Sequence, residues 1–192
     1  MKFVQKEFSF VYEEKKSKFM AYLLPYKDFE EVMTRLKKEH PKARHHVYAY
    51  RYLNEFDQIV ENSSDDGEPR GTSGRPCLHV LAGNELINTA VIVVRYFGGV
   101  KLGTGGLVRA YSDAVNSVIG ISEFLPYEKK ISYALIVPYG TLSLVEYVLN
   151  AQNIEIVKKE FETEVKLILE ASEEAFYELE KSLPLDTILT KL

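Results

Sequence analysis

The chain has 192 residues, of which 46% are hydrophobic and 27% are charged, a composition that excludes a disordered or fibrous protein. Its formal net charge of −4 argues against a protein coated with basic residues for binding duplex nucleic acid. The single cysteine, Cys77, excludes an internal disulfide and predicts a buried thiol. No run approaches about 18 apolar residues, and the first ten residues lack a signal-peptide block, so we expect a cytoplasmic protein without a membrane partner.

The first 53 residues predict strands and one helix. Aromatic residues alternate with lysines over residues 1–26, which predicts one or two strands, the second centred on residues 19–24. Asp28 and Glu31 have the spacing of a helix-capping pair. The apolar residues that follow at helical spacing, Phe29, Val32, Met33 and Leu36, predict a helix that ends before Pro41.

The segment "HHVYAYRYL", residues 45–53, alternates strictly and predicts a strand. One face would carry His46 and three tyrosines, and the other His45, Val47, Ala49 and Arg51. The tyrosines at 48, 50 and 52 have two interpretations, a packed sheet face or a platform on which bases stack. The polar stretch 54–74 is rich in turn formers and predicts a long, mobile loop. A short helix is expected to start at Arg75 and Pro76.

The run "NTAVIVVRYF", residues 88–97, is almost purely apolar and β-branched, which predicts a central strand buried on both faces. Five glycines follow between residues 98 and 106, and an apolar stripe at helical spacing continues to about Ile121. Strand, glycine loop and helix form the arrangement in which unpaired amides at a helix N-terminus receive an anion.

We therefore predict an anion site on the amides of residues 103–107. The residues assigned to it are Gly103, Gly105 and Gly106, the hydroxyl donor Thr104, and the cations Arg95, Lys101 and Arg109. The known nucleotide signatures do not match, because GxxxxGK[ST] is absent and the GxGxxG pattern from Gly103 ends at Val108. The alternative is that the glycines only permit a tight crossing from strand to helix.

Three acidic residues, Asp65, Asp66 and Glu68, lie within four positions. They have the chemistry to hold Mg²⁺ or to act as a general base beside a phosphate. The alternative is a turn at Asp66 and Gly67 with no ligand.

The histidines do not indicate a metal site. His45 and His46 fall on opposite strand faces and no HExxH pattern exists, so we expect no metal and no cofactor. His45 and Arg51 share a face and are predicted either to border the anion site or to be solvated.

The charge distribution divides the chain. Residues 1–125 carry 17 Lys and Arg against 16 Asp and Glu, whereas residues 126–192 carry 7 against 12. The second segment predicts the order βαββαβ, with strands at 131–137, 154–159, 164–169 and 187–192 and helices at 142–152 and 173–183. This order is the ferredoxin-like pattern. A polyanion would meet the first segment more readily.

Four motifs together resemble the IMPACT/YigZ family: "SKF" at 17–19, "HHVYAYR" at 45–51, "DDGEPRGTSGRP" at 65–76 and "VVRYFGGVKLGTGGLVRAYSDA" at 93–114. The resemblance covers about residues 15–120, and the rest is similar to the C-terminal domain of bacterial members. It implies an N-terminal α/β sandwich of the type shared by a small-subunit ribosomal protein and elongation factor G, followed by an elongation-factor-G-like, ferredoxin-like domain. It also implies a translation-linked role with RNA or the ribosome as partner.

These observations predict an α+β protein with domains at 1–125 and 126–192. The leading hypothesis is a translation-associated binding protein that docks RNA or ribosomal phosphates on the glycine loop. The rival is an enzyme acting on a small phosphorylated or nucleotide substrate, with Asp65, Asp66 and Glu68 as metal ligands or base. A third hypothesis is an interaction module that contacts a protein partner through the acidic C-terminal domain.

Overall fold

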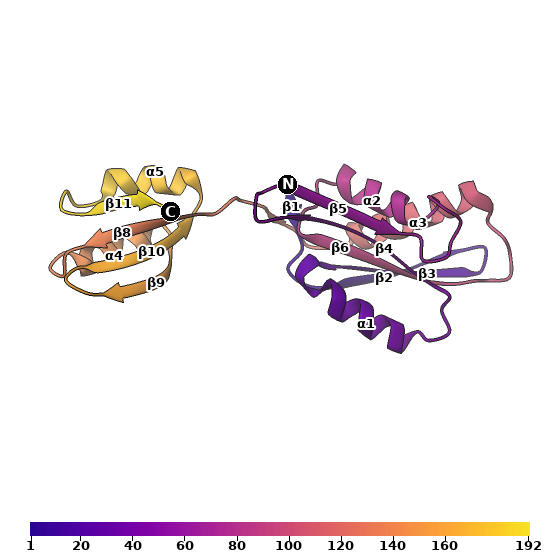
Figure 1. Ribbon diagram of the computed structural model, residues 1–192. Coiled ribbons are helices and arrows are strands. Elements are labelled where there is room, and N and C mark those ends of the chain that lie inside the picture. Colours follow the sequence, from indigo (N-terminus) through magenta and orange to yellow (C-terminus); the bar gives the residue numbers. More distant parts are fainter. The chain divides into compact units, whose positions relative to one another are not determined.

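A computed structural model describes all residues 1–192 and divides into two compact units, Met1–Tyr127 and Glu128–Leu192 (Figure 1). Both units combine helices with β-sheet, so the predicted mixture of α and β structure is confirmed. The division falls two residues beyond the predicted boundary. None of the helices is both long enough and apolar enough to cross a membrane.

The first unit is built on a five-stranded antiparallel sheet. Its strands in spatial order are β2 (Phe8–Glu14), β3 (Ser17–Pro25), β6 (Thr89–Tyr96), β4 (His45–Leu53) and β5 (Ile59–Ser64). The short strands β1 (Lys2–Phe3) and β7 (Leu125–Pro126) form a separate antiparallel pair, which joins the two ends of the unit. The β-branched run 89–96 therefore occupies the centre of the sheet, as predicted.

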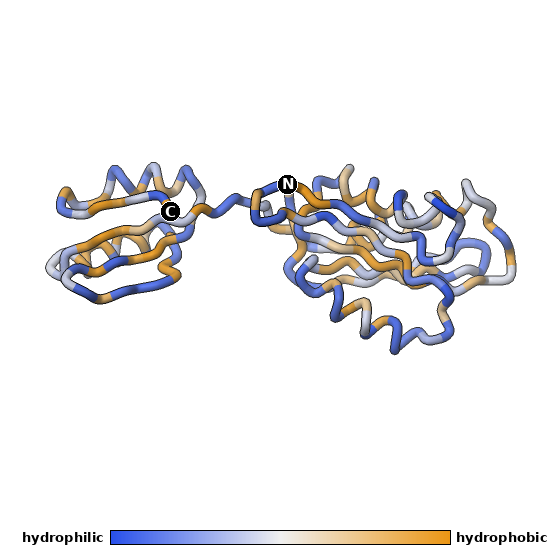
Figure 2. Tube along the Cα trace, in the orientation of Figure 1, coloured by the Kyte–Doolittle hydropathy of each residue, from blue (hydrophilic) through white to orange (hydrophobic).

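Helices cover both faces of this sheet (Figure 1). The 3₁₀ turn η1 (Tyr26–Asp28) leads into α1 (Phe29–Glu39) on one face, and α2 (Gly74–Gly83) and α3 (Gly103–Gly120) lie on the other. Residues 91–94 of β6 are consequently fully buried, and the central strands appear as the hydrophobic part of the unit in Figure 2. This two-sided burial explains why β6 does not alternate polar and apolar residues.

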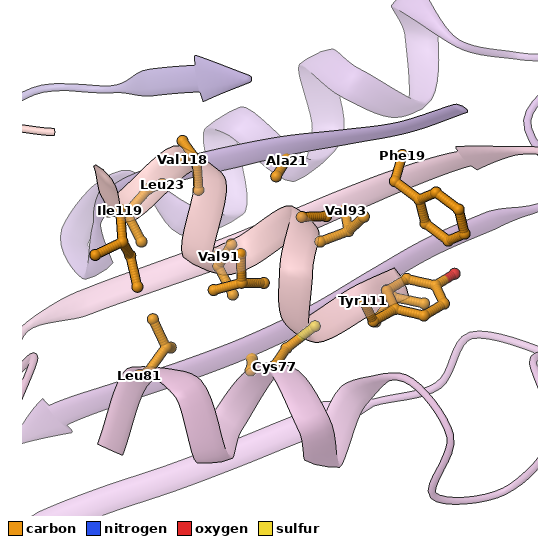
Figure 3. Packing of buried hydrophobic residues seen from close by; sticks show 14 of the residues in the cluster. Phe19, Ala21, Leu23, Cys77, Leu81, Val91, Val93, Tyr111, Val118 and Ile119 are labelled. Atoms are coloured by element: carbon orange, nitrogen blue, oxygen red, sulfur yellow. The ribbon is translucent and has the colours of Figure 1, made fainter. Parts of the chain in front are cut away.

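The larger core lies between the sheet and helices α2 and α3 (Figure 3). Phe19 of β3 meets Tyr111 of α3 edge to face, with ring centroids 5.0 Å apart at 84°. Cys77 of α2 is fully buried in this core, and burial raises the pKa of its thiol, which confirms the predicted buried cysteine. Tyr111 thus anchors the first half of α3 to the sheet.

Two local predictions are wrong. Residues 59–64, expected in a mobile loop, form the edge strand β5, which pairs with β4 after a turn in which Asn54 N–H donates to the Gln58 carbonyl. A polar strand fits there because an edge strand exposes much of its length to water. Asp28 precedes α1 but makes no side-chain capping bond, because the chain enters α1 through η1.

The tyrosine stripe of β4 packs against α1 and the segment before it. Tyr52 stacks on Tyr26, with ring centroids 4.1 Å apart and planes 4° apart, and Tyr50 lies 5.3 Å from Phe29. Burial raises the pKa of Tyr26 to about 12. Of the two interpretations, the structure supports the packed sheet face.

The second unit follows the predicted order of elements. These are β8 (Ile131–Val137), α4 (Leu142–Ala151), β9 (Glu155–Phe161), β10 (Val165–Ala171), α5 (Glu173–Ser182) and β11 (Ile188–Lys191). The antiparallel sheet has the spatial order β11-β8-β10-β9. Its core joins one face of the sheet to α4 and α5, and Ser172 caps α5 by accepting a hydrogen bond from Ala175 N–H at 3.3 Å.

Candidate functional site

The first unit contains a cleft of about 760 Å³ beside the start of α3. Three separate chain segments line it: the loop between α1 and β4, the loop after β5, and the stretch from the end of β6 to α3. The lining residues are Lys42, Arg44, His45, Glu68, Pro69, Arg95, Tyr96, Phe97, Lys101, Leu102, Gly103, Thr104 and Leu107. The cleft therefore includes part of the predicted anion site and basic residues that were not assigned to it.

Sheet register brings the first and third segments together. His45, the first residue of β4, pairs with Arg95 near the end of β6, so the loop before β4 lies beside the loop after β6. His40 fixes the start of that loop, because its ring nitrogens lie 3.3 Å from the Tyr22 hydroxyl and 3.1 Å from the Tyr96 hydroxyl. Ala43 N–H then donates to the His40 carbonyl and closes a turn.

The inner wall of the cleft is a buried group of three side chains. Arg95 Nη1 donates to Glu68 Oε1 at 2.5 Å, and the Tyr111 hydroxyl donates to the same oxygen at 2.9 Å. The side chains of Arg95 and Glu68 are only 7% and 4% exposed. Burial and the Glu68 carboxylate raise the pKa of Tyr111, so its hydroxyl stays protonated and remains a donor.

Arg95 is therefore not the free cation that the sequence predicts. Glu68 neutralises its charge, and its guanidinium carbon lies 5.3 Å from the Phe19 ring centroid and 5.8 Å from the Phe97 ring centroid. Its Nε is buried and has no hydrogen-bond partner. The side chain acts first as a structural link between the core and the cleft.

His45 is oriented by the acidic loop. Its Nδ1 lies 2.8 Å from the Asp66 carbonyl oxygen, which can only accept, so Nδ1 carries the proton. Its Nε2 then faces Glu68 Oε1 at 3.9 Å. The Asp66 carboxylate is used elsewhere, because it accepts the His46 N–H at 2.6 Å.

Asp65 braces the loop that presents Glu68. Its carboxylate accepts hydrogen bonds from Gly71 N–H at 2.7 Å, Ser73 Oγ at 2.7 Å and Gly74 N–H at 2.9 Å. Burial alone would raise the pKa of Asp65, but these hydrogen bonds outweigh it and hold the pKa below its ordinary value. Because the donors include amides at the start of α2, Asp65 caps that helix from a distance.

The three acidic side chains therefore do not point to one common site. Asp65 caps α2, Asp66 accepts a backbone amide, and Glu68 pairs with Arg95. The chain contains no group of three or more His, Cys, Asp or Glu side chains placed to hold a metal ion. Although these acids are close in sequence, they do not form a shared ligand site.

The outer rim carries free positive charge. Lys42, Arg44 and Lys101 are exposed and form no ion pair. The first-turn amides of an α-helix have no intrahelical acceptor, and in α3 the N-cap residue Leu102 supplies no side-chain acceptor for them either. The positive end of the α3 dipole and three unpaired cations meet at one cleft.

The glycines serve different purposes. A side chain at Gly98 would overlap the Lys16 backbone in the turn between β2 and β3, and Gly98 N–H donates to Ser17 Oγ at 3.1 Å. Gly99 and Gly103 adopt φ values of +89° and +73°, in the left-handed region, with open space around them. The loop therefore makes a tight crossing at Gly98 and leaves room for a ligand farther on.

Two predicted cations lie outside the cleft. Arg109 lines a separate hollow with Glu14, Lys15, Gly106 and Asp113, and its Nε donates to the Gly105 carbonyl at 3.3 Å. Helical periodicity explains this, because Gly103, Thr104 and Leu107 share the cleft side of α3, whereas Arg109 points elsewhere.

Arg51 is also separated from the cleft. It pairs with Glu61 at 2.6 Å and donates to the Leu86 carbonyl at 2.8 Å. It shares a face with His45, as predicted, but the two residues are six positions apart along an extended strand, roughly 20 Å. The structure does not bring these two residues to one site.

The sequence prediction missed Lys42, Arg44 and Phe97. The signal for the first two was present as "PKARHH", a basic cluster directly before a strand. Only the pairing of β4 with β6 places that cluster beside the glycine loop.

Residues 15–119, more than half of the chain, match the model of the Impact N-terminal domain. The chain belongs to the IMPACT family. An IMPACT family member of Haemophilus influenzae is 39% identical over 168 residues, covering 85% of this chain and 82% of that protein. The IMPACT family member YigZ of Escherichia coli is 35% identical over 161 residues, covering 82% of this chain and 78% of YigZ.

A solved crystal structure, described only as that of a hypothetical protein, is also similar. It has a TM-score of 0.73 and 29% identity, with 100% of this chain and 96% of that chain covered. All the residues that line the cleft, 42–107, fall inside the segment that matches the IMPACT family model. The cleft is therefore built entirely from the family's N-terminal domain.

Proposed function

We propose that this IMPACT family chain is a cytoplasmic, translation-associated binding protein whose cleft docks phosphate groups of RNA or of the ribosome. The observation that carries the proposal is the meeting of three unpaired cations with an uncapped helix N-terminus at one cleft. Family membership adds the link to translation that the resemblance implies.

The charges around the cleft favour a polyanion. The only carboxylate in the lining belongs to Glu68, and Arg95 already neutralises it. Lys42, Arg44 and Lys101 remain exposed, so phosphates would gain three favourable interactions without breaking an existing ion pair. This local excess arises although the first unit carries a net charge of only +1.

The backbone adds donors of fixed direction. Gly103 and Thr104 lie in the cleft wall at the first turn of α3, where amides lack intrahelical acceptors. Such amides bind phosphate oxygens without needing a charged side chain. The Thr104 hydroxyl, exposed in the same wall, supplies a further donor.

The rival proposal of an enzyme requires carboxylates free to hold a metal or accept a proton. Asp65, Asp66 and Glu68 are each occupied by other partners, so no observation favours that role for them. A thermal-shift screen with nucleotides and Mg²⁺ tests it, because a ligand at 100 times its Kd stabilises a protein by about 2.7 kcal/mol. A clear shift with one nucleotide would favour the enzyme.

We propose a ferredoxin-like fold for the second unit and a sandwich of the ribosomal-protein and elongation-factor type for the first. Support for the former is the order βαββαβ with strands arranged β11-β8-β10-β9. The second unit carries a net charge of −5, and its sheet face away from α4 and α5 bears Ile136, Ile168 and Ile188. Negative charge with an apolar strip suits a protein partner better than RNA.

The test of the cleft is RNA or ribosome binding between about 50 and 200 mM salt. Affinity should fall as salt rises, because each neutralised phosphate releases counterions. Lys101→Ala should weaken binding and reduce the salt slope by about 1. Arg109→Ala is the matched control, since Arg109 lies near the same helix end but outside the cleft, and it should bind nearly as the wild type does.

Two results would reject the proposal. The first is no binding at the lowest salt concentration. The second is an equal loss for Lys101→Ala and Arg109→Ala, which would place the phosphates away from the cleft.

A further inference from the structure

One exposed aromatic side chain lies among the cations of the cleft. Phe97 is 57% exposed, and it lines the cleft together with Arg44 and Lys101. Single exposed apolar residues are common on protein surfaces and need no explanation alone. The combination of an exposed ring with unpaired cations is the arrangement by which proteins hold unpaired nucleic acid strands.

The Phe97 ring contacts the buried Arg95 side chain. The Arg95 guanidinium carbon lies 5.8 Å from its centroid, and Glu68 and Phe19 fix Arg95 in turn. The backbone just after Phe97 is also restrained, because Gly98 packs tightly against the Lys16 backbone. These contacts restrict the ring and its backbone, and a restricted ring loses less entropy when a base stacks on it.

We propose that the cleft takes an unpaired RNA segment, with a base stacked on Phe97 and its neighbouring phosphate held by Lys101 and the first amides of α3. This inference rests on the proposed function. A paired base already stacks inside its helix and offers no face, so stacking selects unpaired nucleotides. The cleft volume of about 760 Å³ has room for a ligand of that size.

The experiment measures fluorescence anisotropy with three probes of equal length. They are an unpaired RNA, the same RNA annealed into a duplex, and a strand with the same phosphates whose central bases are removed. Wild type should bind the unpaired RNA most tightly. Phe97→Leu should weaken binding of that RNA about 5-fold to 100-fold, the range measured for loss of one stacked base, and should leave the abasic strand unchanged.

Three other variants separate the contributions of base and phosphate. Phe97→Tyr keeps a ring and should retain the affinity for unpaired RNA. Phe56→Leu is the matched control, because Phe56 is 71% exposed but lies in the turn between β4 and β5, outside the cleft. Lys101→Ala should weaken binding of the unpaired RNA and of the abasic strand to the same extent.

The outcomes distinguish this inference from the proposed function. Unchanged binding of unpaired RNA by Phe97→Leu, or tighter binding of the duplex by wild type, overturns the stacking role while the phosphate site stands. Failure of the wild type to bind any probe at about 50 mM salt rejects the proposed function and the stacking role with it. Thermal unfolding of each variant confirms that the fold is retained.

Discussion

Both walls of the cleft carry positive charge, but the cation of the inner wall is buried and paired, whereas those of the outer rim are exposed and unpaired. On the inner wall Arg95 is 7% exposed and bonded to Glu68, whereas on the outer rim Lys101 is exposed and unpaired. A cation beside a cleft is available to a ligand only when the fold has not already supplied its counterion. The inner wall gives the cleft its shape, and the rim gives it its charge.

The energetic consequences of this difference are large. A buried charge that loses its partner is left without solvent, so breaking a buried pair costs about 3–5 kcal/mol. A charge on the rim is solvated with or without its neighbours, and surface substitutions usually change stability by less than about 0.5 kcal/mol. Stability measurements therefore separate the two walls before any ligand is known.

The largest effect is expected for Glu68→Ala. It removes the carboxylate that neutralises Arg95 and accepts the Tyr111 hydroxyl, so the free energy of unfolding should fall by about 3–5 kcal/mol. Urea unfolding followed by circular dichroism measures the change. Glu7→Ala provides a matched control, because Glu7 pairs with Arg35 at the surface and its loss should cost only about 0–1 kcal/mol. Similar losses for the two variants would contradict a structural inner wall.

An intermediate effect is expected for Asp65→Asn. The substitution weakens the hydrogen bonds that hold the loop bearing Glu68, and should lower the free energy of unfolding by about 0.5–2 kcal/mol at pH 7. Because the pKa of Asp65 is lowered by folding, its carboxylate contributes stability above about pH 4, and this contribution is lost as the pH falls through the folded-state pKa.

The difference between wild type and Asp65→Asn should therefore shrink in urea unfolding at about pH 3. A difference that is constant between neutral and acidic pH would show that the charge of Asp65 does not brace the loop.

The smallest effect on stability is expected for the rim. Lys101→Ala should unfold within about 0.5 kcal/mol of wild type, because Lys101 is exposed and forms no ion pair. The same urea titrations measure it. A loss comparable to that of Glu68→Ala would mean that the rim supports the fold, and would remove the distinction between the two walls.

Prediction from the sequence succeeded where the pattern lies within a single segment. The run 89–96 predicts a buried central strand because every residue before Arg95 is apolar or β-branched, and the apolar stripe from Leu107 to Ile119 predicts a helix. The elements of the second unit follow from the same periodicities. Edge strand β5 was missed because its polar residues carry no alternating signal.

The site was harder to predict because its contacts are distant in sequence. Glu68 and Arg95 are 27 residues apart, and nothing local to either residue shows that they pair. Nearness in the chain places Arg109 in the predicted anion site of residues 103–107, yet the helical turn directs its side chain into another hollow. The basic cluster at Lys42 and Arg44 lies beside the glycine loop only because β4 pairs with β6 in this register.

The tight crossing at Gly98 also divides the glycine loop into a crowded part and an open part. Gly98 lies directly against the Lys16 backbone in the turn between β2 and β3, whereas Gly99 and Gly103 have open space around them and adopt positive φ values. A side chain at Gly98 would therefore have to displace the Lys16 backbone, whereas one at Gly99 or Gly103 would meet no neighbouring atom and would be strained only by its positive φ.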